Sequence, residues 1–128
     1  MADLKLLAKE WIDKADHDLK IAQEDFGKPE RVDVVAFYSQ QAAEKYLKAF
    51  LVFKKSSFPK IHDIDELLNR CSKISNEFEK FKRSATILAP LYVGARYPFM
   101  GIITIYDVEK AVKAAKEIGV FVKEQLKL

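Results

Sequence analysis

The segment RVDVVAFYSQQAAEKYLKAFLVFK, residues 31–54, decides the fold, because it has the pattern of a long helix that is apolar on two sides. Its main apolar stripe recurs every three or four residues and comprises Val35, Tyr38, Ala42, Tyr46, Ala49 and Phe53. Phe37, Leu47 and Leu51 fall on the far side. A helix with two apolar sides contacts more than one neighbour. We therefore expect this segment either at the centre of a helical bundle or at a subunit interface.

Three other long helices are predicted, over residues 3–25, 75–96 and 104–126, because each range carries apolar residues at helical spacing. The residues that open these ranges, Asp, Ser and Thr, are good N-caps. Asp107 follows Thr104 by three positions, which resembles a capping box. Gly119 falls inside the last helix and weakens it by roughly 1 kcal/mol relative to alanine, unless a neighbouring helix requires a close approach.

The connections between these helices are short. Residues 26–29, Phe-Gly-Lys-Pro, are a turn signal, and a loop over residues 55–62 leads into a short helix at residues 63–71. Pro98 disfavours helical geometry at the residue before it, so the third long helix is expected to end near Arg96. No segment has a convincing strand pattern. The predicted fold is all-α, an up-down antiparallel four-helix bundle with one additional short helix.

Composition describes an ordered globular protein. The 128 residues are 49% hydrophobic and 32% charged, and we expect one domain over residues 1–128. The net charge of +3 neither predicts nor excludes nucleic-acid binding. Cys71 is the only cysteine, which excludes an internal disulfide. The sequence has neither a secretory signal pattern nor an apolar run of membrane-spanning length, so a cytoplasmic protein without membrane contact is expected.

No familiar catalytic motif is present. The sequence lacks a Gly-rich phosphate loop, a Cys/His cluster with metal-ligand spacing and a serine-nucleophile motif, so neither metal nor cofactor is expected. His17 is interpreted as a surface residue on the polar side of the first helix. His62 precedes Asp63 at a helix start, where capping or solvent exposure explains it. Lysines and glutamates alternate along the last helix, which favours a solvated face over a nucleic-acid patch.

A polar strip runs along the segment at residues 31–54. Phe37, Gln41, Glu44 and Lys48 are spaced by four, three and four residues and share one face. Glu44 and Lys48 can form an i, i+4 ion pair, which contributes only a few tenths of a kcal/mol on an exposed helix. The strip is either a solvated face or a polar groove that faces a partner helix or a nucleotide.

The second candidate is the Arg-Tyr-Pro corner at residues 96–98. Arg96 is either a cation that stabilises a helix C-terminus by roughly 0.3–1 kcal/mol or a fork-shaped donor to a phosphate. In the second case Tyr92 or Tyr97 provides a surface on which a base can stack.

Four segments together resemble a HEPN domain (higher eukaryote and prokaryote nucleotide-binding). They are FYSQQAAEKYLKAFLV, HDIDELL, LYVGARYP and the alanine-rich last helix, and the resemblance covers nearly the whole chain. The chain is similar to the small stand-alone prokaryotic members, which are often paired with a minimal nucleotidyltransferase. The resemblance implies an all-α bundle that commonly forms homodimers. Many members are metal-independent RNases, and some are toxins of toxin–antitoxin pairs.

The resemblance also implies where chemistry is expected. The RNase motif of the family is an arginine followed, after four to six residues, by a histidine. Arg96 matches the arginine, but Gly101, Ile102 and Ile103 occupy the positions at which the histidine would stand. Loss of a general acid or base lowers a rate by about 10²–10⁴.

Three functions are compatible with an RNase motif that has its arginine but not its histidine. The first is a homodimer, non-catalytic or weakly active, that binds a nucleotide, an RNA or a partner nucleotidyltransferase. Its expected ligand contacts are Arg96, Tyr97, Tyr92, Gln41, Glu44 and Lys48. The second is an endoribonuclease that uses Arg96 with an unidentified base, and the third is a purely structural subunit.

Overall fold

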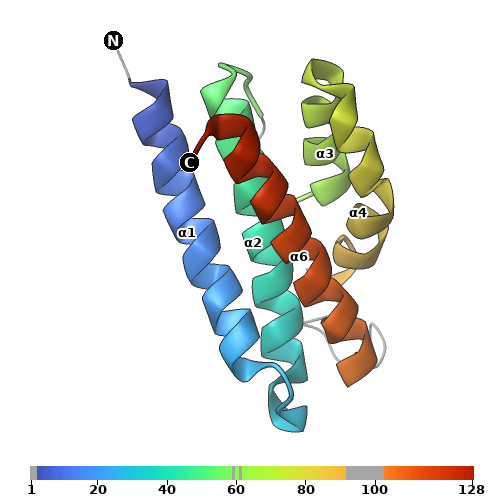
Figure 1. Ribbon diagram of the computed structural model, residues 1–128. Helices are drawn as coiled ribbons and strands as arrows, with labels where there is room; N and C mark the ends of the chain where they lie inside the picture. The colour runs from blue at the N-terminus through green and yellow to red at the C-terminus, as the bar shows by residue number, and fades with distance from the viewer. Residues whose placement is uncertain (1–2, 59, 61, 92–102) are drawn as a thin grey trace.

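Helices account for all the secondary structure of residues 3–58, 60, 62–91 and 103–128, which are the residues that the computed structural model describes. The long helices are α1 (Leu4–Asp25), α2 (Val32–Phe53) and α6 (Ile105–Leu126). The shorter ones are α3 (Ile64–Ile74) and α4 (Lys82–Leu88), with 3₁₀ turns η1 (Pro29–Arg31) and η2 (Asn76–Phe81). The all-α prediction is confirmed. Figure 1 shows α1 antiparallel to α2, and α4 antiparallel to α6.

Helix α2 lies at the centre of this arrangement, as its two apolar sides predicted. It packs against α1 on one side, α6 on another and α3 on a third. The core side chains Val35, Tyr46, Phe50 and Leu51 are all buried. Because α2 is covered on several sides, some of its polar residues are also buried, namely Ser39, Gln40, Gln41, Glu44 and Lys48.

Side-chain caps fix the starts of three helices. The Asp3 carboxylate accepts a hydrogen bond from the Leu6 amide at 3.1 Å, and Thr104 and Asp107 form the predicted capping box. Asp63 caps α3. The expected Ser75 cap is wrong, since its side chain makes no capping hydrogen bond and the segment after it is the 3₁₀ turn η2.

The unbroken helix predicted from residue 75 to residue 96 is also wrong. After η2, the α-helical part α4 ends at Leu88. Pro90 accounts for the end, because proline has no amide hydrogen to donate within a helix and its ring clashes with the preceding turn. The expected end of this helix at Arg96 lies outside the described residues.

A close approach of α6 to α2 explains Gly119. A Cβ atom at this position would lie 2.6 Å from the Tyr46 ring, so the glycine provides the space that this ring occupies. The Tyr46 hydroxyl donates to the Asp16 carboxylate at 2.5 Å, and Lys123 Nζ lies 2.7 Å from the same carboxylate. These contacts join α1, α2 and α6. Burial, with the Asp16 hydrogen bond, raises the pKa of Tyr46 well above its ordinary range.

Aromatic rings fill the opposite side of α6. The Phe78 ring contacts both Phe50 and Phe121, with centroid separations of 4.5 and 5.0 Å. Phe81 lies 5.3 Å from Phe121. This cluster attaches η2, the turn that precedes α4, to the α2–α6 pair.

Candidate functional site

The polar strip predicted on α2 is buried. The exposed fractions of Gln41, Glu44 and Lys48 are 9%, 2% and 7%. The interpretation of the strip as a solvated face is therefore wrong. Burial of a charged pair is unfavourable unless its members are bonded to each other and to further polar groups, so the bonding partners of these residues decide what the strip can do.

Glu44 is the centre of these bonds. Its Oε1 atom lies 2.7 Å from Lys48 Nζ, and its Oε2 atom accepts a hydrogen bond from Gln41 Nε2 at 3.2 Å. Both carboxylate oxygens also face His62 Nδ1, at 2.9 and 3.1 Å. We call Gln41, Glu44, Lys48 and His62 the Glu44 network. A cation, an amide and an imidazole thus satisfy one buried carboxylate.

Two aromatic rings enclose the lysine of the network. Lys48 Nζ lies 5.4 Å from the centroid of the Trp11 ring and 5.6 Å from that of Phe58. The two rings meet edge to face at 6.2 Å. An ammonium group at this distance from aromatic rings gains a cation–π interaction. The rings also shield the Glu44–Lys48 pair from water, which strengthens its attraction.

His62 is the network residue that reaches solvent, since its side chain is 47% exposed. Its interpretation as a helix cap is wrong, because Asp63 caps α3. The expected solvent exposure is confirmed, but the ring is also bonded to Glu44. A carboxylate can only accept, so Nδ1 carries a proton and Nε2 is the acceptor of the neutral ring. The Gln40 side chain donates to the His62 carbonyl at 3.4 Å, which holds the loop against α2.

The sequence contained a partial signal for this histidine. The loop at residues 55–62 is long enough to return from the end of α2 to the position of Glu44, and a polar face on a central helix needs partners. What the sequence lacks is any spacing rule that links residue 62 to residue 44, because the contact depends on the path of the loop.

Three of the six predicted ligand-binding residues meet in this network. The other three, Tyr92, Arg96 and Tyr97, lie outside the described residues. Their proposed role remains a prediction. His17, interpreted as a surface residue, is exposed on α1.

Other kinds of chemistry find little support among the described residues. In residues 3–58, 60, 62–91 and 103–128, no three His, Cys, Asp or Glu side chains are grouped as metal ligands would be. Burial raises the pKa of the Cys71 thiol to about 12, so the reactive thiolate is scarce at neutral pH. Within the same residues, no helix is both long and apolar enough to cross a membrane.

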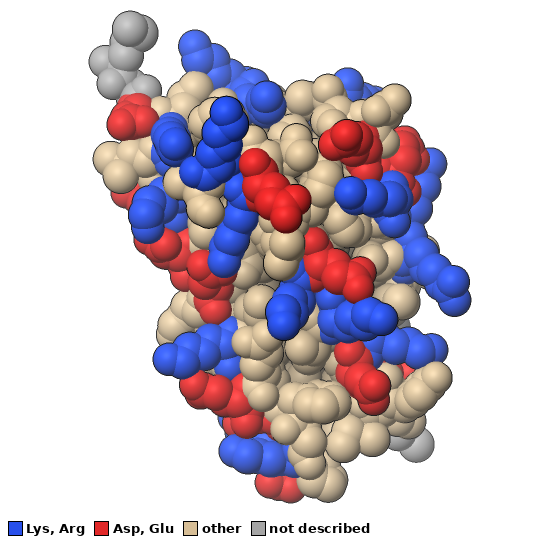
Figure 2. All heavy atoms as spheres, viewed as in Figure 1, with Lys and Arg blue, Asp and Glu red and all other residues tan. Residues whose placement is uncertain are grey.

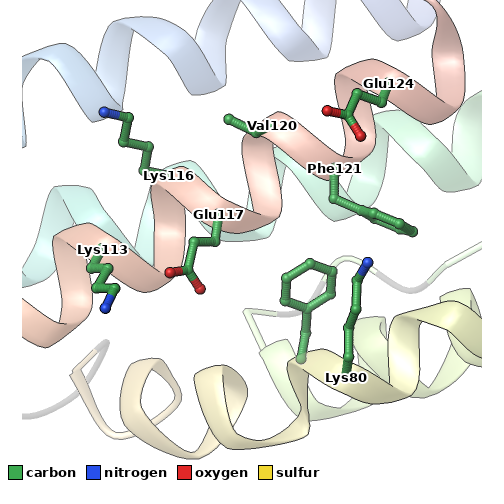
Figure 3. Close-up of a pocket in the computed structure, with 8 residues that line it drawn as sticks. Lys80, Lys113, Lys116, Glu117, Val120, Phe121 and Glu124 are labelled. Atoms are coloured by element: carbon green, nitrogen blue, oxygen red, sulfur yellow. The ribbon is translucent and has the colours of Figure 1, made fainter.

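A second feature is a hollow of about 550 Å³ between η2 and α6. Figure 3 shows Lys80 and Phe121 extending toward each other across it, and Lys80 Nζ lies 4.0 Å from the centroid of the Phe121 ring. Glu117 and Lys113 extend from α6 on the same side. Figure 2 shows basic and acidic side chains interspersed over this face of the molecule, consistent with the charge alternation along α6.

Comparisons with known proteins identify the family. A model of the HEPN domain matches residues 8–125. Among solved structures, the chain is similar to TT1696 from Thermus thermophilus, with 28% identity, a TM-score of 0.82, and coverage of 91% of this chain and 96% of that one. It is also similar to ST0689, an archaeal HEPN homologue, with 28% identity, a TM-score of 0.75, and coverage of 93% and 97%. A comparison with curated proteins finds no match. Since the family model spans nearly the whole sequence and the fold agrees with it, this protein belongs to the HEPN domain family.

Proposed function

We propose that this HEPN protein is a homodimer that binds a phosphate-bearing ligand, a nucleotide or an RNA, with weak catalysis or none. The observation that carries the proposal is the Glu44 network, in which buried charged groups hold a half-exposed histidine. A partner nucleotidyltransferase and a toxin–antitoxin setting belong to the same proposal, and only the family resemblance supports them.

The energetics of the network favour a site over a purely structural role. Well-packed apolar residues often replace a buried ion pair with no loss of stability. Glu44 and Lys48 are therefore poorly explained as stabilising groups alone. Gln41, Glu44 and Lys48 act in this proposal as positioning residues for His62, while Arg96, Tyr97 and Tyr92 contact the phosphate or base.

Isothermal titration with ATP, GTP and a single-stranded RNA of about twelve nucleotides tests the binding. We expect His62→Ala and Arg96→Ala each to weaken binding by about tenfold or more. His17→Ala, the other histidine, serves as the matched control and should leave the affinity unchanged. If none of the probes binds, the purely structural subunit is the better description.

The homodimer has a separate test. Sedimentation velocity gives the solution mass of the purified protein, for which we expect twice the mass of one chain. A strict monomer at all concentrations contradicts the dimer, whatever the titrations show.

One observation favours a second candidate, an endoribonuclease. A histidine whose Nδ1 faces a carboxylate has the arrangement of a general base. His62 is thus a candidate for the unidentified base that Arg96 lacks. In this reaction the base takes the proton of a 2′-hydroxyl, the 2′-oxygen bonds to the adjacent phosphorus, and the 5′-oxygen leaves with a proton from solvent.

Cleavage of a labelled RNA in the presence of EDTA tests this candidate. We expect loss of cleavage by about 10²–10⁴ in His62→Ala and no change in His17→Ala. Cleavage that persists in His62→Ala shows that this histidine is not the base, and the same result in Arg96→Ala excludes Arg96.

A further inference from the structure

A groove extends along α6, between that helix and the η2–α4 segment. The hollow of about 550 Å³ adjoins a second one of about 350 Å³, and both are lined by Lys80, Lys113 and Glu117. Together they extend from Lys110 to Glu124 on α6. This span corresponds to about 21 Å of helix, the length of a short partner helix. We call these two hollows the α4–α6 groove.

The groove offers apolar surface at its rim, above two buried aromatic rings. Phe81 and Phe121 lie against each other below the larger hollow. Lys80 extends from η2 toward α6, and its Nζ atom approaches the Phe121 ring, as Figure 3 shows. Val120, on the outer side of α6, is 50% exposed. A partner that buries Val120 and the lysine stem removes apolar surface from water.

The walls of the groove are mainly basic. Lys80, Arg83, Lys110 and Lys113 line it, with Lys116 at the rim and two carboxylates, Glu117 and Glu124. Within the part of the chain that the structure describes, no ion pair involves Arg83, Lys113 or Lys116. Lys113 and Glu117 are four residues apart on α6 and still do not pair. The positive charge is thus available to a partner.

We infer that the α4–α6 groove docks an acidic amphipathic helix of a partner protein. An apolar ridge at i, i+3, i+4 and i+7 fits against Val120 and the alkyl chains of the lysines, and flanking carboxylates match the groove's excess of lysine and arginine. A nucleic acid fits less well, because Glu117 and Glu124 would repel its phosphates. In addition, the described aromatic rings of the groove, Phe81 and Phe121, are buried and offer no stacking face.

A synthetic peptide tests the inference without knowledge of the natural partner. The probe is a fluorescein-labelled helical peptide of about 18 residues, with leucines along one face and glutamates on its flanks. Its affinity for the full-length protein is measured by fluorescence anisotropy at ~50 mM salt, where electrostatic attraction is little screened. A scrambled peptide of equal composition, a lysine-for-glutamate peptide and a single-stranded RNA are the comparison probes.

We expect the acidic amphipathic peptide to bind at least about tenfold more tightly than the scrambled peptide and the lysine-for-glutamate peptide. Lys113→Glu and Val120→Asp should each weaken its binding by about tenfold or more. The matched controls are Lys5→Glu and Leu6→Asp on the exposed face of α1, which should leave binding unchanged. Circular dichroism of each variant confirms that it is folded.

Three results would overturn the inference. The first is absence of peptide binding, and the second is equal binding of the scrambled peptide. The third is RNA binding that Lys113→Glu abolishes while Val120→Asp leaves it intact, since this pattern identifies a nucleic-acid surface. Ligand titrations with His62→Ala are independent of all three, because His62 does not line the groove.

Discussion

The Glu44 network and the α4–α6 groove contain the same residue types at the same spacing in opposite states. Glu44 and Lys48 stand four apart on α2, form a 2.7 Å ion pair and are buried. Lys113 and Glu117 stand four apart on α6 in an open groove, and the described structure shows no ion pair between them. The neighbours of each helix cause the difference. Trp11, Phe58 and the loop at His62 cover α2, whereas α6 has one face in solvent.

Removal of one carboxylate from each region gives the largest expected contrast. Glu44→Ala leaves the Lys48 ammonium buried without its partner, so we expect the free energy of unfolding to fall by about 3–5 kcal/mol. Glu117→Ala, in the groove, should change it by less than about 0.5 kcal/mol. Urea denaturation measures both. If the two substitutions change the free energy of unfolding equally, the burial of Glu44 has no effect on its contribution to stability.

The double variant Glu44→Met with Lys48→Met separates stability from function in the same comparison. Because both charges leave together, we expect stability near that of the wild type. Ligand binding through His62 should still be lost, since the imidazole no longer has its carboxylate. If the double variant binds ligand normally, the Glu44 network is not part of the ligand site.

Gly119 lies on α6 between the two regions and provides the next largest effect. A methyl group at this position enters the space of the Tyr46 ring, 2.6 Å away. Overpacking of this kind lowers stability by about 1–3 kcal/mol, although alanine favours an isolated helix by about 1 kcal/mol. We therefore expect Gly119→Ala to lower the melting temperature, while Val120→Ala, one residue along, changes it little. A stabilised Gly119→Ala protein would contradict the close contact.

Periodicity predicted the helices because burial of one face leaves a direct record in the sequence. The two sides of α2, the cap at Asp3 and the Thr104 capping box all follow from local patterns. A glycine within a predicted helix also indicates a close approach of a neighbouring helix, and α2 makes that approach at Gly119. Helix α4 is shorter than its apolar stripe predicts, because Pro90 interrupts the helix within that stripe.

The candidate site was predictable only in part. Gln41, Glu44 and Lys48 were found because one helix face carries all three. His62 was missed as their partner because a loop brings it there, and loop paths leave no periodic pattern. The burial of Lys48 was missed for a similar reason, since it requires Trp11 from α1 and Phe58 from the loop.

The buried hydroxyl of Tyr46 predicts a dependence of stability on pH. Its pKa in the folded protein lies above the ordinary value, so above pH ~10 the unfolded chain releases a proton that the folded chain retains. Stability is then present below pH ~10 and falls as pH rises further, by up to ~1.4 kcal/mol per pH unit. Tyr46→Phe should flatten this slope, and Tyr106→Phe, an exposed tyrosine on α6, should not. Thermal melts from pH 9 to 11 measure both. An unchanged slope in Tyr46→Phe would assign the alkaline loss to other groups, such as Cys71.

The smallest expected effect comes from reversing the order of charges in the groove pair, Lys113 and Glu117. A glutamate that precedes lysine by four residues is the favourable order on an isolated helix. The swap of Lys113→Glu with Glu117→Lys should therefore raise the free energy of unfolding by about 0.2–0.5 kcal/mol. The same swap at Glu44 and Lys48 should be strongly destabilising, because the donors of His62 and Gln41 then face an ammonium group. If both swaps have small effects, the bonds of the Glu44 network contribute little to stability, and the order of charges along the helix alone governs both regions.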